Sequence, residues 1–190
     1  MTRTIVADLF LTLIHYPVLN RNGQVVTSAI TSLDLHDIAR SARTYGVRAM
    51  YVVHPVAEQR DFAVRVLDHW RLDYGRLYDS RRREALELVE VVPDLETAMN
   101  AAKAIGKAQP LLVYTSAKVT SDVSYGELRN RVESRNGPPL MLMFGTGFGL
   151  APAMLERADI IVTAVRGPGE YNHLSVRAAA SVILDRLAGR

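Results

Sequence analysis

The stretch Phe144-Gly-Thr-Gly-Phe-Gly-Leu150 follows a short apolar run, 140–144, that is typical of a buried strand. A second glycine-bearing stretch, Arg166-Gly-Pro-Gly-Glu-Tyr-Asn-His-Leu-Ser-Val176, follows the apolar run 160–165, and both stretches lead into helical patterns. Glycine suits such loops because it has no side chain to block a ligand and tolerates positive φ. Ligands of open α/β sheets bind outside the carboxyl ends of the strands. The two loops therefore predict a small-molecule site in the last quarter of the chain.

The rest of the chain alternates apolar runs with helical patterns. Strands are expected at 5–14, 47–53, 89–92, 111–114, 140–144 and 160–165, and helices at 34–45, 62–74, 85–88, 95–105, 124–134, from 152, and at 176–187. Asp34 is expected to cap the first helix, and Ser124 and Glu127 to form a capping box. The alternation predicts a single α/β domain over 1–190, with a mainly parallel six-stranded sheet and helices on both faces.

The bulk properties limit the class of protein. A length of 190 residues suits one domain, and the 48% apolar and 23% charged content is ordinary for a globular chain. The absence of cysteine excludes disulfides, thiolate metal sites and cysteine nucleophiles, and the histidines show no metal-ligand spacing. No apolar run approaches the roughly 20 residues of a membrane span, and the N-terminus has no signal-peptide pattern. A cytoplasmic protein with no metal and no membrane partner is expected.

Arginine supplies most of the positive charge, with lysine only at 103, 107 and 118 and a net charge of +3. Because arginine binds phosphate through a planar pair of donors, RNA binding is one interpretation, and a genome rich in arginine codons is the other. The run Arg81-Arg-Arg83 and the helix carrying Arg129, Arg131 and Arg135 are candidate contacts to an RNA backbone. Charge runs are commonly solvated faces, so both interpretations stay open.

A dinucleotide-binding oxidoreductase is one alternative for the glycine loop. The sequence Gly145-Thr-Gly-Phe-Gly149 is one residue short of G-x-G-x-x-G and follows the fifth expected strand instead of the first. Glu170 lies about 20 residues further on, but in a loop and not at the tip of the second strand. The pattern therefore argues against nicotinamide-cofactor binding.

Three segments, taken together, resemble the SPOUT class of S-adenosylmethionine-dependent RNA methyltransferases. Phe144 to Leu150 is similar to the second motif of that class, and Asn172-His-Leu-Ser-Val176 with the alanines after it is similar to the third. The helix from Asp34 to Gly46, which carries Arg40, is similar to the first motif of the ribose-methylating branch. A short, uncharacterised bacterial subfamily that also has His15-Tyr-Pro17 matches best. The resemblance spans about 32–187.

The resemblance implies a C-terminal trefoil knot, a homodimer whose active sites use residues of both subunits, and S-adenosylmethionine as the cofactor. Structured RNA, either tRNA or rRNA, is the implied partner and methyl acceptor. An adenosylmethionine-binding or RNA-binding regulator that has lost catalysis is the alternative on the same fold. In two places the sequence departs from the ribose-methylating branch, with Asp34 in place of an asparagine and Gly147 near a glutamate position. Both departures argue against ribose methylation, and neither selects a particular base.

The resemblance also implies the residues of the site. Cofactor binding is predicted for three strand-end loops, through Tyr114, Thr115, Ser116, Phe144, Gly145, Thr146, Gly147, Gly149, Leu150, Val165, Gly167, Tyr171 and Leu174. A tight turn is the structural alternative for the glycines, and helix capping is the alternative for Thr115 and Ser116.

Catalytic or acceptor-side roles are predicted for Arg40, Glu170, Asn172 and Ser175. The structural alternative for Arg40 is an ion pair with Asp37 on the same helix, and for Asn172 and Ser175 it is capping of the last helix. Glu170 and His173 are candidate general bases in the third loop, and Asp34, His36 and Asp37 are their rivals in the first segment.

Overall fold

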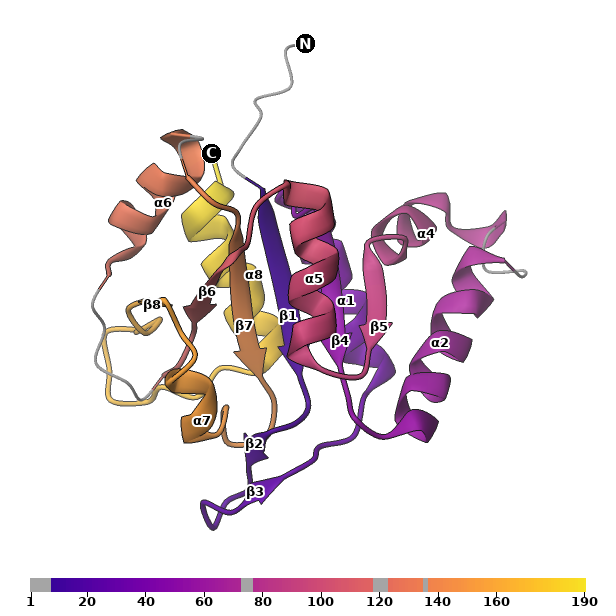
Figure 1. Ribbon diagram of the computed structural model, residues 1–190, viewed down its shortest axis with the longest axis horizontal. Coiled ribbons are helices and arrows are strands. Elements are labelled where there is room, and N and C mark those ends of the chain that lie inside the picture. Colours follow the sequence, from indigo (N-terminus) through magenta and orange to yellow (C-terminus); the bar gives the residue numbers. More distant parts are fainter. Residues whose placement is uncertain (1–7, 73–76, 118–122, 135–136) are drawn as a thin grey trace.

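Six parallel strands form the central sheet of the protein, whose computed structural model describes residues 8–72, 77–117, 123–134 and 137–190 (Figure 1). The strands lie in the order β5-β4-β1-β7-β6-β8. Their bounds are β1 Leu9–Ile14, β4 Ala49–Val53, β5 Val89–Val92, β6 Leu111–Tyr114, β7 Leu140–Gly145 and β8 Ile160–Ile161. The predicted parallel six-stranded sheet is therefore confirmed.

Helices cover both faces of this sheet, as predicted (Figure 1). They are α1 Ser32–Thr44, α2 Ala57–Arg71, α4 Ser80–Leu86, α5 Leu95–Gly106, α6 Tyr125–Ser134, α7 Pro152–Leu155 and α8 Val176–Ala188. One core contains residues of α1, α2, α4, α6 and α8, and the second contains residues of α5 and α7. None of the helices in the described part of the chain combines the length and apolarity needed to cross a membrane.

The central strands β1 and β7 lie next to each other in the sheet, and the first glycine-bearing loop follows β7 directly. They pair in parallel from Leu9 opposite Leu140 to Ile14 opposite Gly145, and nearly all of their residues are buried. Such continuous apolar runs are expected where both faces of a parallel sheet are covered. The buried Thr12 hydroxyl donates a hydrogen bond to the Leu142 carbonyl oxygen at 3.0 Å, so this polar group is satisfied inside the sheet.

The first helix starts earlier than predicted. Thr31, not Asp34, is the N-cap residue: its side-chain oxygen accepts a hydrogen bond from the Asp34 backbone N–H. The Thr31 hydroxyl in turn donates to Asp34 Oδ2 at 2.7 Å. The prediction of Asp34 as the cap was wrong because an acidic residue three positions after a threonine completes a capping pair from inside the first turn. The Ser124 and Glu127 capping box at the start of α6 is confirmed.

The last strand is shorter than predicted and ends at Ile161 instead of Val165. Its neighbour β6 ends at Tyr114, so beyond Ile161 the chain meets only an isolated bridge between Val162 and Val123. The remaining residues of the apolar run lie outside the strand and lead into the second glycine-bearing loop. Helix α4 also begins earlier than predicted, because Asp79 caps it through the backbone N–H groups of Arg81 and Arg82.

Two short strands that the sequence did not predict lie beside the site. β2 Val18–Leu19 and β3 Val25–Val26 form an antiparallel hairpin around the polar turn at 20–23. The expected start of the first strand at 5–7, the helix end at 74–75, and Arg135 lie outside the described residues. The hairpin matters for function because β2 also bonds to the first glycine loop, as described below.

Candidate cofactor-binding site

Four segments meet around one cavity of about 990 Å³ at the carboxyl ends of β6 and β7. They are 28–34 before and within α1, 115–117 after β6, 144–150 after β7, and 165–177 leading into α8. The sequence predicted the last three. Ligand cavities of small-molecule sites occupy roughly 300–1,000 Å³, so this volume is sufficient for a nucleoside-sized cofactor.

Backbone geometry explains the glycines of the first loop. Gly147 and Gly149 have φ values of 59° and 110°, which side-chain-bearing residues rarely adopt. The loop is fixed to β2, because the Phe148 N–H donates to the Leu19 carbonyl oxygen at 2.9 Å and the Leu19 N–H donates to the Gly149 carbonyl oxygen at 2.8 Å. A tight turn and a close approach to the cavity are therefore the same structure here, not alternatives.

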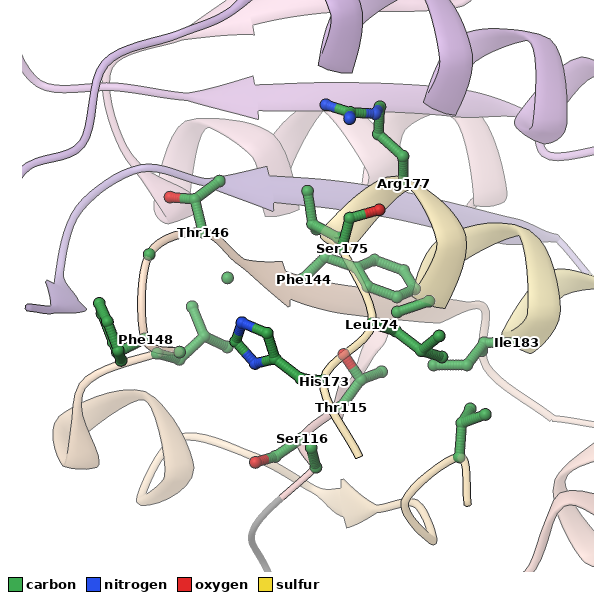
Figure 2. Close-up of a pocket in the computed structure, with 18 of the residues that line it drawn as sticks. Thr115, Ser116, Phe144, Thr146, Phe148, His173, Leu174, Ser175, Arg177 and Ile183 are labelled. Carbon is green, nitrogen blue, oxygen red and sulfur yellow. The ribbon is translucent and has the colours of Figure 1, made fainter. Parts of the chain in front are cut away.

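Apolar side chains form one wall of the cavity, where Figure 2 shows Phe144, Leu174 and Ile183 gathered beneath the start of α8. Leu150 and Val165 also line the cavity. Thr115, which the sequence left between a cofactor role and a helix cap, donates its hydroxyl to the Met143 carbonyl oxygen at 2.7 Å. This hydrogen bond joins β6 to β7 at the floor of the site. An aromatic base or adenine ring fits such a wall, because flat apolar surfaces favour stacking.

The second glycine-bearing loop is tied by hydrogen bonds to the loop 115–117 after β6 and to the start of α8. Asn172 donates its side-chain amide to the Ala117 carbonyl oxygen at 3.4 Å, and Ser175 caps α8 by accepting the Ala178 N–H. Capping thus accounts for Ser175 but not for Asn172. Figure 2 shows His173 projecting into the cavity beside the first glycine loop.

A buried polar network supports the first loop from below. His15 and His54 end β1 and β4 and are almost fully buried, with ring centroids 5.6 Å apart. His54 Nδ1 accepts the Val56 N–H at 3.1 Å, so Nε2 carries the proton and donates to the Ser28 carbonyl oxygen at 3.0 Å. His15 Nδ1 lies 3.0 Å from the Ser28 hydroxyl, and that hydroxyl contacts the Thr146 hydroxyl.

Two carbonyl oxygens, which can only accept, lie at this network. The Thr146 hydroxyl is 3.4 Å from the Ile14 carbonyl oxygen, and the Ser28 hydroxyl is 3.5 Å from the His15 carbonyl oxygen. When Thr146 donates to Ile14, it accepts from Ser28, and Ser28 then accepts from the Nδ1–H of a neutral His15. Burial lowers the pKa of His15 to about 4, with the neighbouring His54 as the second cause, so the neutral form is the stable one at physiological pH. Burial also lowers the pKa of His54.

Replacement of Thr146 by valine tests whether this network positions the loop. The variant keeps the side-chain shape but removes the hydroxyl that links Ser28 to Ile14. A net hydrogen bond is worth about 1 kcal/mol, so we expect S-adenosylhomocysteine, the product of the cofactor that the SPOUT resemblance implies, to bind about five-fold more weakly. Calorimetric titration measures this change. An unaltered dissociation constant would show that the loop holds its position without the network.

An arginine that the sequence did not single out joins the cavity to a neighbouring groove. Arg177, in the first turn of α8, donates from Nη1 to Asp34 Oδ1 at 2.9 Å, and its Nε lies 3.5 Å from Asp37 Oδ2. Asp34 is 6% exposed and lines the cavity, whereas Asp37 lines the groove with Arg40 and Ser41. Arg177 lines both. The ion pair between Arg40 and Asp37, which was the structural alternative for Arg40, is absent from the described residues, and Asp37 pairs with Arg177.

Ten of the predicted cofactor residues line the cavity: Thr115, Ser116, Phe144, Gly145, Thr146, Gly147, Gly149, Leu150, Val165 and Leu174. Three do not. Tyr114 is buried in the second core, because successive strand residues alternate between the faces of the sheet. Gly167 and Tyr171 lie on the outer part of their loop, where Tyr171 is 82% exposed.

The acceptor-side predictions divide in the same way. Asn172 and Ser175 line the cavity, whereas the exposed Glu170 does not. Arg40 lies in the neighbouring groove, because helical spacing places it on the outer side of α1. Of the rival bases, Asp34 and His173 line the cavity, and His36 and Asp37 do not.

Several lining residues were missed, among them Ser28, Ala29, Thr31, Tyr125 and Arg177, whereas Phe148 and Arg166 lie within the predicted loops but were not singled out. Ser28 and Thr31 precede α1 and had no motif to mark them. Arg177 directly follows the third motif, so its proximity to Ser175 was an available signal.

The predicted RNA contacts outside the site are partly used within the fold. Arg82 lies over the Trp70 ring at 4.4 Å, and Arg83 pairs with Glu87. Arg129 pairs with Glu133 and donates to the Gly189 carbonyl oxygen, so it ties α6 to the end of α8. Arg81 and Arg131 are exposed and remain candidate contacts to RNA. Within the described ranges, no three histidine or acidic side chains are grouped as metal ligands.

The loops at adjacent strand ends of this parallel sheet enclose one cavity, and they carry glycines where a ligand would approach the backbone. This arrangement is that of an α/β protein that holds a nucleoside-like ligand. The family model described as "SAM-dependent RNA methyltransferase" matches residues 8–189. The chain therefore belongs to the S-adenosylmethionine-dependent RNA methyltransferases, which confirms the predicted family and its cofactor.

Relatives and solved structures agree with this assignment. An uncharacterised protein of Aquifex aeolicus is 36% identical over 96% of this chain and 89% of its own length. A "tRNA (guanine-N(1)-)-methyltransferase" of Nitratidesulfovibrio vulgaris is 41% identical over 96% of this chain, but the chain spans only 42% of that relative. The fold is similar to the SpoU methyltransferase AviRb of Streptomyces viridochromogenes, with a TM-score of 0.60, 19% identity, and coverage of 96% of this chain and 59% of that one. This likeness confirms the predicted fold, whereas the family assignment rests on the family model.

Proposed function

We propose that this protein transfers a methyl group from S-adenosylmethionine to a nucleotide of tRNA. The observation that carries the proposal is that the two glycine-bearing loops line the same cavity, in a chain that matches the methyltransferase family along nearly its full length. When bound, the cofactor supplies an activated methyl group on a sulfonium, so the protein needs to supply positioning and acceptor-side chemistry and no metal.

The lining residues fit that cofactor. The backbone of the loop 145–149 offers amide and carbonyl groups to an adenine edge, and Leu150 and Leu174 offer apolar contacts to its faces. The hydroxyls of Thr115 and Ser116 stand at the opposite side of the cavity floor. These residues would hold the cofactor, while Asn172, His173 and Asp34 face the space left for the acceptor.

The choice of tRNA is supported by two relatives named as tRNA methyltransferases, each with this chain aligned to 42% of its length. Proteins that join two segments in one chain commonly act on a shared substrate. The guanine-N1 specificity in their name is not transferred, because most of each relative lies outside the match. We place the reaction in the cytoplasm, where tRNA is modified.

The test is methyl transfer from labelled S-adenosylmethionine to total tRNA from a strain that lacks the gene. We expect label in tRNA from that strain and little label in tRNA from the parent strain, whose target is already methylated. S-adenosylhomocysteine binding, measured by calorimetry, tests the cofactor independently. Cofactor binding without transfer to tRNA or rRNA would instead favour a regulator that has lost catalysis.

We further propose that the active unit is a homodimer in which Arg40 of one subunit serves the cavity of the other. Arg40 is exposed in a groove formed by α1 and α8, and it does not line the cavity of its own subunit. A site that uses Arg40 is therefore incomplete in one copy of the chain. The C-terminal knot of the class stays a prediction for this chain.

Mixing two inactive variants tests the shared site. Arg40→Ala should lose turnover and keep S-adenosylhomocysteine binding, and Gly147→Val should lose both. After subunit exchange, half of the dimers are mixed and each has one intact site, so about a quarter of the wild-type rate should return. A mixture that stays inactive despite subunit exchange, shown by mass spectrometry, would place Arg40 in its own subunit's site or outside the reaction.

A further inference from the structure

The Asp34 carboxylate is the only acidic side chain on the cavity wall among the described residues. Its side chain is 9% exposed, and two donors hold it: Thr31 at Oδ2 (2.7 Å) and Arg177 at Oδ1 (2.9 Å). A carboxylate has about four acceptor sites on its two oxygens, so two remain after these bonds. Asp34 can therefore still accept a hydrogen bond from a ligand in the cavity.

Arg177 fixes the direction of this carboxylate. Its guanidinium contacts Asp34 on the cavity side and Asp37 on the groove side, and it belongs to α8 whereas both acids belong to α1. Figure 2 shows the Arg177 side chain on the opposite side of the α8 start from His173 and Leu174. Arg177 thus holds Asp34 Oδ1 in place, and the remaining acceptor sites of the carboxylate are those available to a ligand in the cavity.

We propose that Asp34 is the proton acceptor for methyl transfer, and that the acceptor is a ring N–H of a nucleobase, with Arg177 as the positioning residue. This inference rests on the proposed methyltransferase function. The ring nitrogen gives an electron pair to the methyl carbon, the carbon–sulfur bond breaks with its electrons left on sulfur, and the proton of the nitrogen passes to the Asp34 carboxylate. The products are a neutral methylated base, S-adenosylhomocysteine and a carboxylic acid that then releases its proton to water.

The weak basicity of a carboxylate favours this class of acceptor over a ribose hydroxyl. Proton transfer is efficient only when donor and acceptor are matched in acidity. The ring N–H of guanine or uracil is far more acidic than a ribose hydroxyl, so a carboxylate can take its proton as the new bond forms. Among the other polar side chains that line the cavity, the hydroxyls of Thr31, Ser28 and Ser175 are already used in capping or in the His15 network.

The Asp34→Asn variant keeps the shape of the side chain and removes its capacity to take a proton. We expect the rate of transfer to total tRNA from the gene-deleted strain to fall about 10²–10³-fold, with S-adenosylhomocysteine affinity within about three-fold of wild type. Asp37→Asn removes the same charge from the other partner of Arg177, on the groove side, and should change the rate less than about five-fold. Arg177→Gln as a single substitution should lower the rate of methyl transfer. Added to Asp34→Asn, it should lower that rate little further, because Arg177 acts through Asp34.

The chemical identity of the product gives a second test that needs no variant. Alkaline hydrolysis of labelled RNA releases a methylated base in a labelled mononucleotide, whereas a ribose 2′-O-methyl group protects its bond and leaves a labelled dinucleotide. Label in mononucleotides supports the inference, and label in dinucleotides overturns it. Wild-type transfer with a fully active Asp34→Asn variant also overturns it while leaving the methyltransferase function intact. If the wild type neither binds S-adenosylhomocysteine nor methylates RNA, the function proposed above fails, and this inference fails with it.

Discussion

The Gly147→Val variant is expected to lose S-adenosylhomocysteine binding by at least about 100-fold, which corresponds to about 2.7 kcal/mol. Gly147 has a φ of 59°, which a β-branched residue adopts only with strain. A Cβ at this position would also stand 2.9 Å from the Leu19 carbonyl oxygen. That oxygen accepts the Phe148 N–H and belongs to β2, so it has little freedom to move away. The loop must therefore leave β2, and the cavity loses its glycine wall.

A matched control separates this local effect from a general loss of folding. Gly169 lies in the second loop, has no positive φ, and would place a Cβ within 4 Å of no other atom. Gly169→Ala should therefore bind S-adenosylhomocysteine like the wild type. Thermal unfolding of both variants reports whether the sheet is intact. Tight binding by a folded Gly147→Val protein would place the cofactor outside the 144–150 loop.

Acidification is expected to destabilise the protein through His15. Burial lowers the pKa of His15 from 6.5 to about 4, so the neutral side chain is the form that the folded state accepts. Above pH 6.5 neither the folded nor the unfolded state binds a proton here, and the full stability is present. Between pH 6.5 and 4 the unfolded chain binds the proton and the folded chain does not. The free energy of unfolding therefore decreases by about 3 kcal/mol in total as the pH is lowered from 6.5 to 4.

The physical cause lies in the network that His15 completes. A second ring proton on Nε2 would have no acceptor in the described structure and would add a charge 5.6 Å from the His54 ring. In the folded protein His15 takes up this proton only near pH 4, so between pH 6.5 and 4 acid lowers the free energy of unfolding without changing the His15 side of the site.

The His15→Asn variant isolates this contribution. The asparagine amide can donate to the Ser28 hydroxyl as Nδ1 does, but it does not titrate. Urea unfolding at several pH values between 7 and 4 should show a stability loss that is smaller in the variant by about 3 kcal/mol. The titration of carboxylates is common to both proteins and cancels in the difference. Parallel curves for the two proteins would show that His15 is not the group responsible.

Local sequence patterns gave most of the secondary structure correctly, because periodicity, caps and breakers act over a few residues. Helix α5 begins at Leu95 as predicted, and β5 and β6 have the predicted bounds. The errors arose where a partner decided the outcome. Asp34 was misassigned because Thr31 takes the cap, and the last strand stops at Ile161 because β6 provides no further neighbour.

The sequence by itself determined the α/β class, the family and three of the loops around the cavity, since each depends on motifs that are contiguous in the chain. Only the tertiary structure decided which polar groups act together. Arg177 meets Asp34 across 143 positions, and Ser28 meets Thr146 across 118. The tertiary structure also places Arg40 in the neighbouring groove, outside the cavity of its own subunit, and joins β2 to the first glycine loop by hydrogen bonds. No local pattern encodes such pairs, because a single polar residue has no periodicity and its partner is chosen by the packing of distant elements.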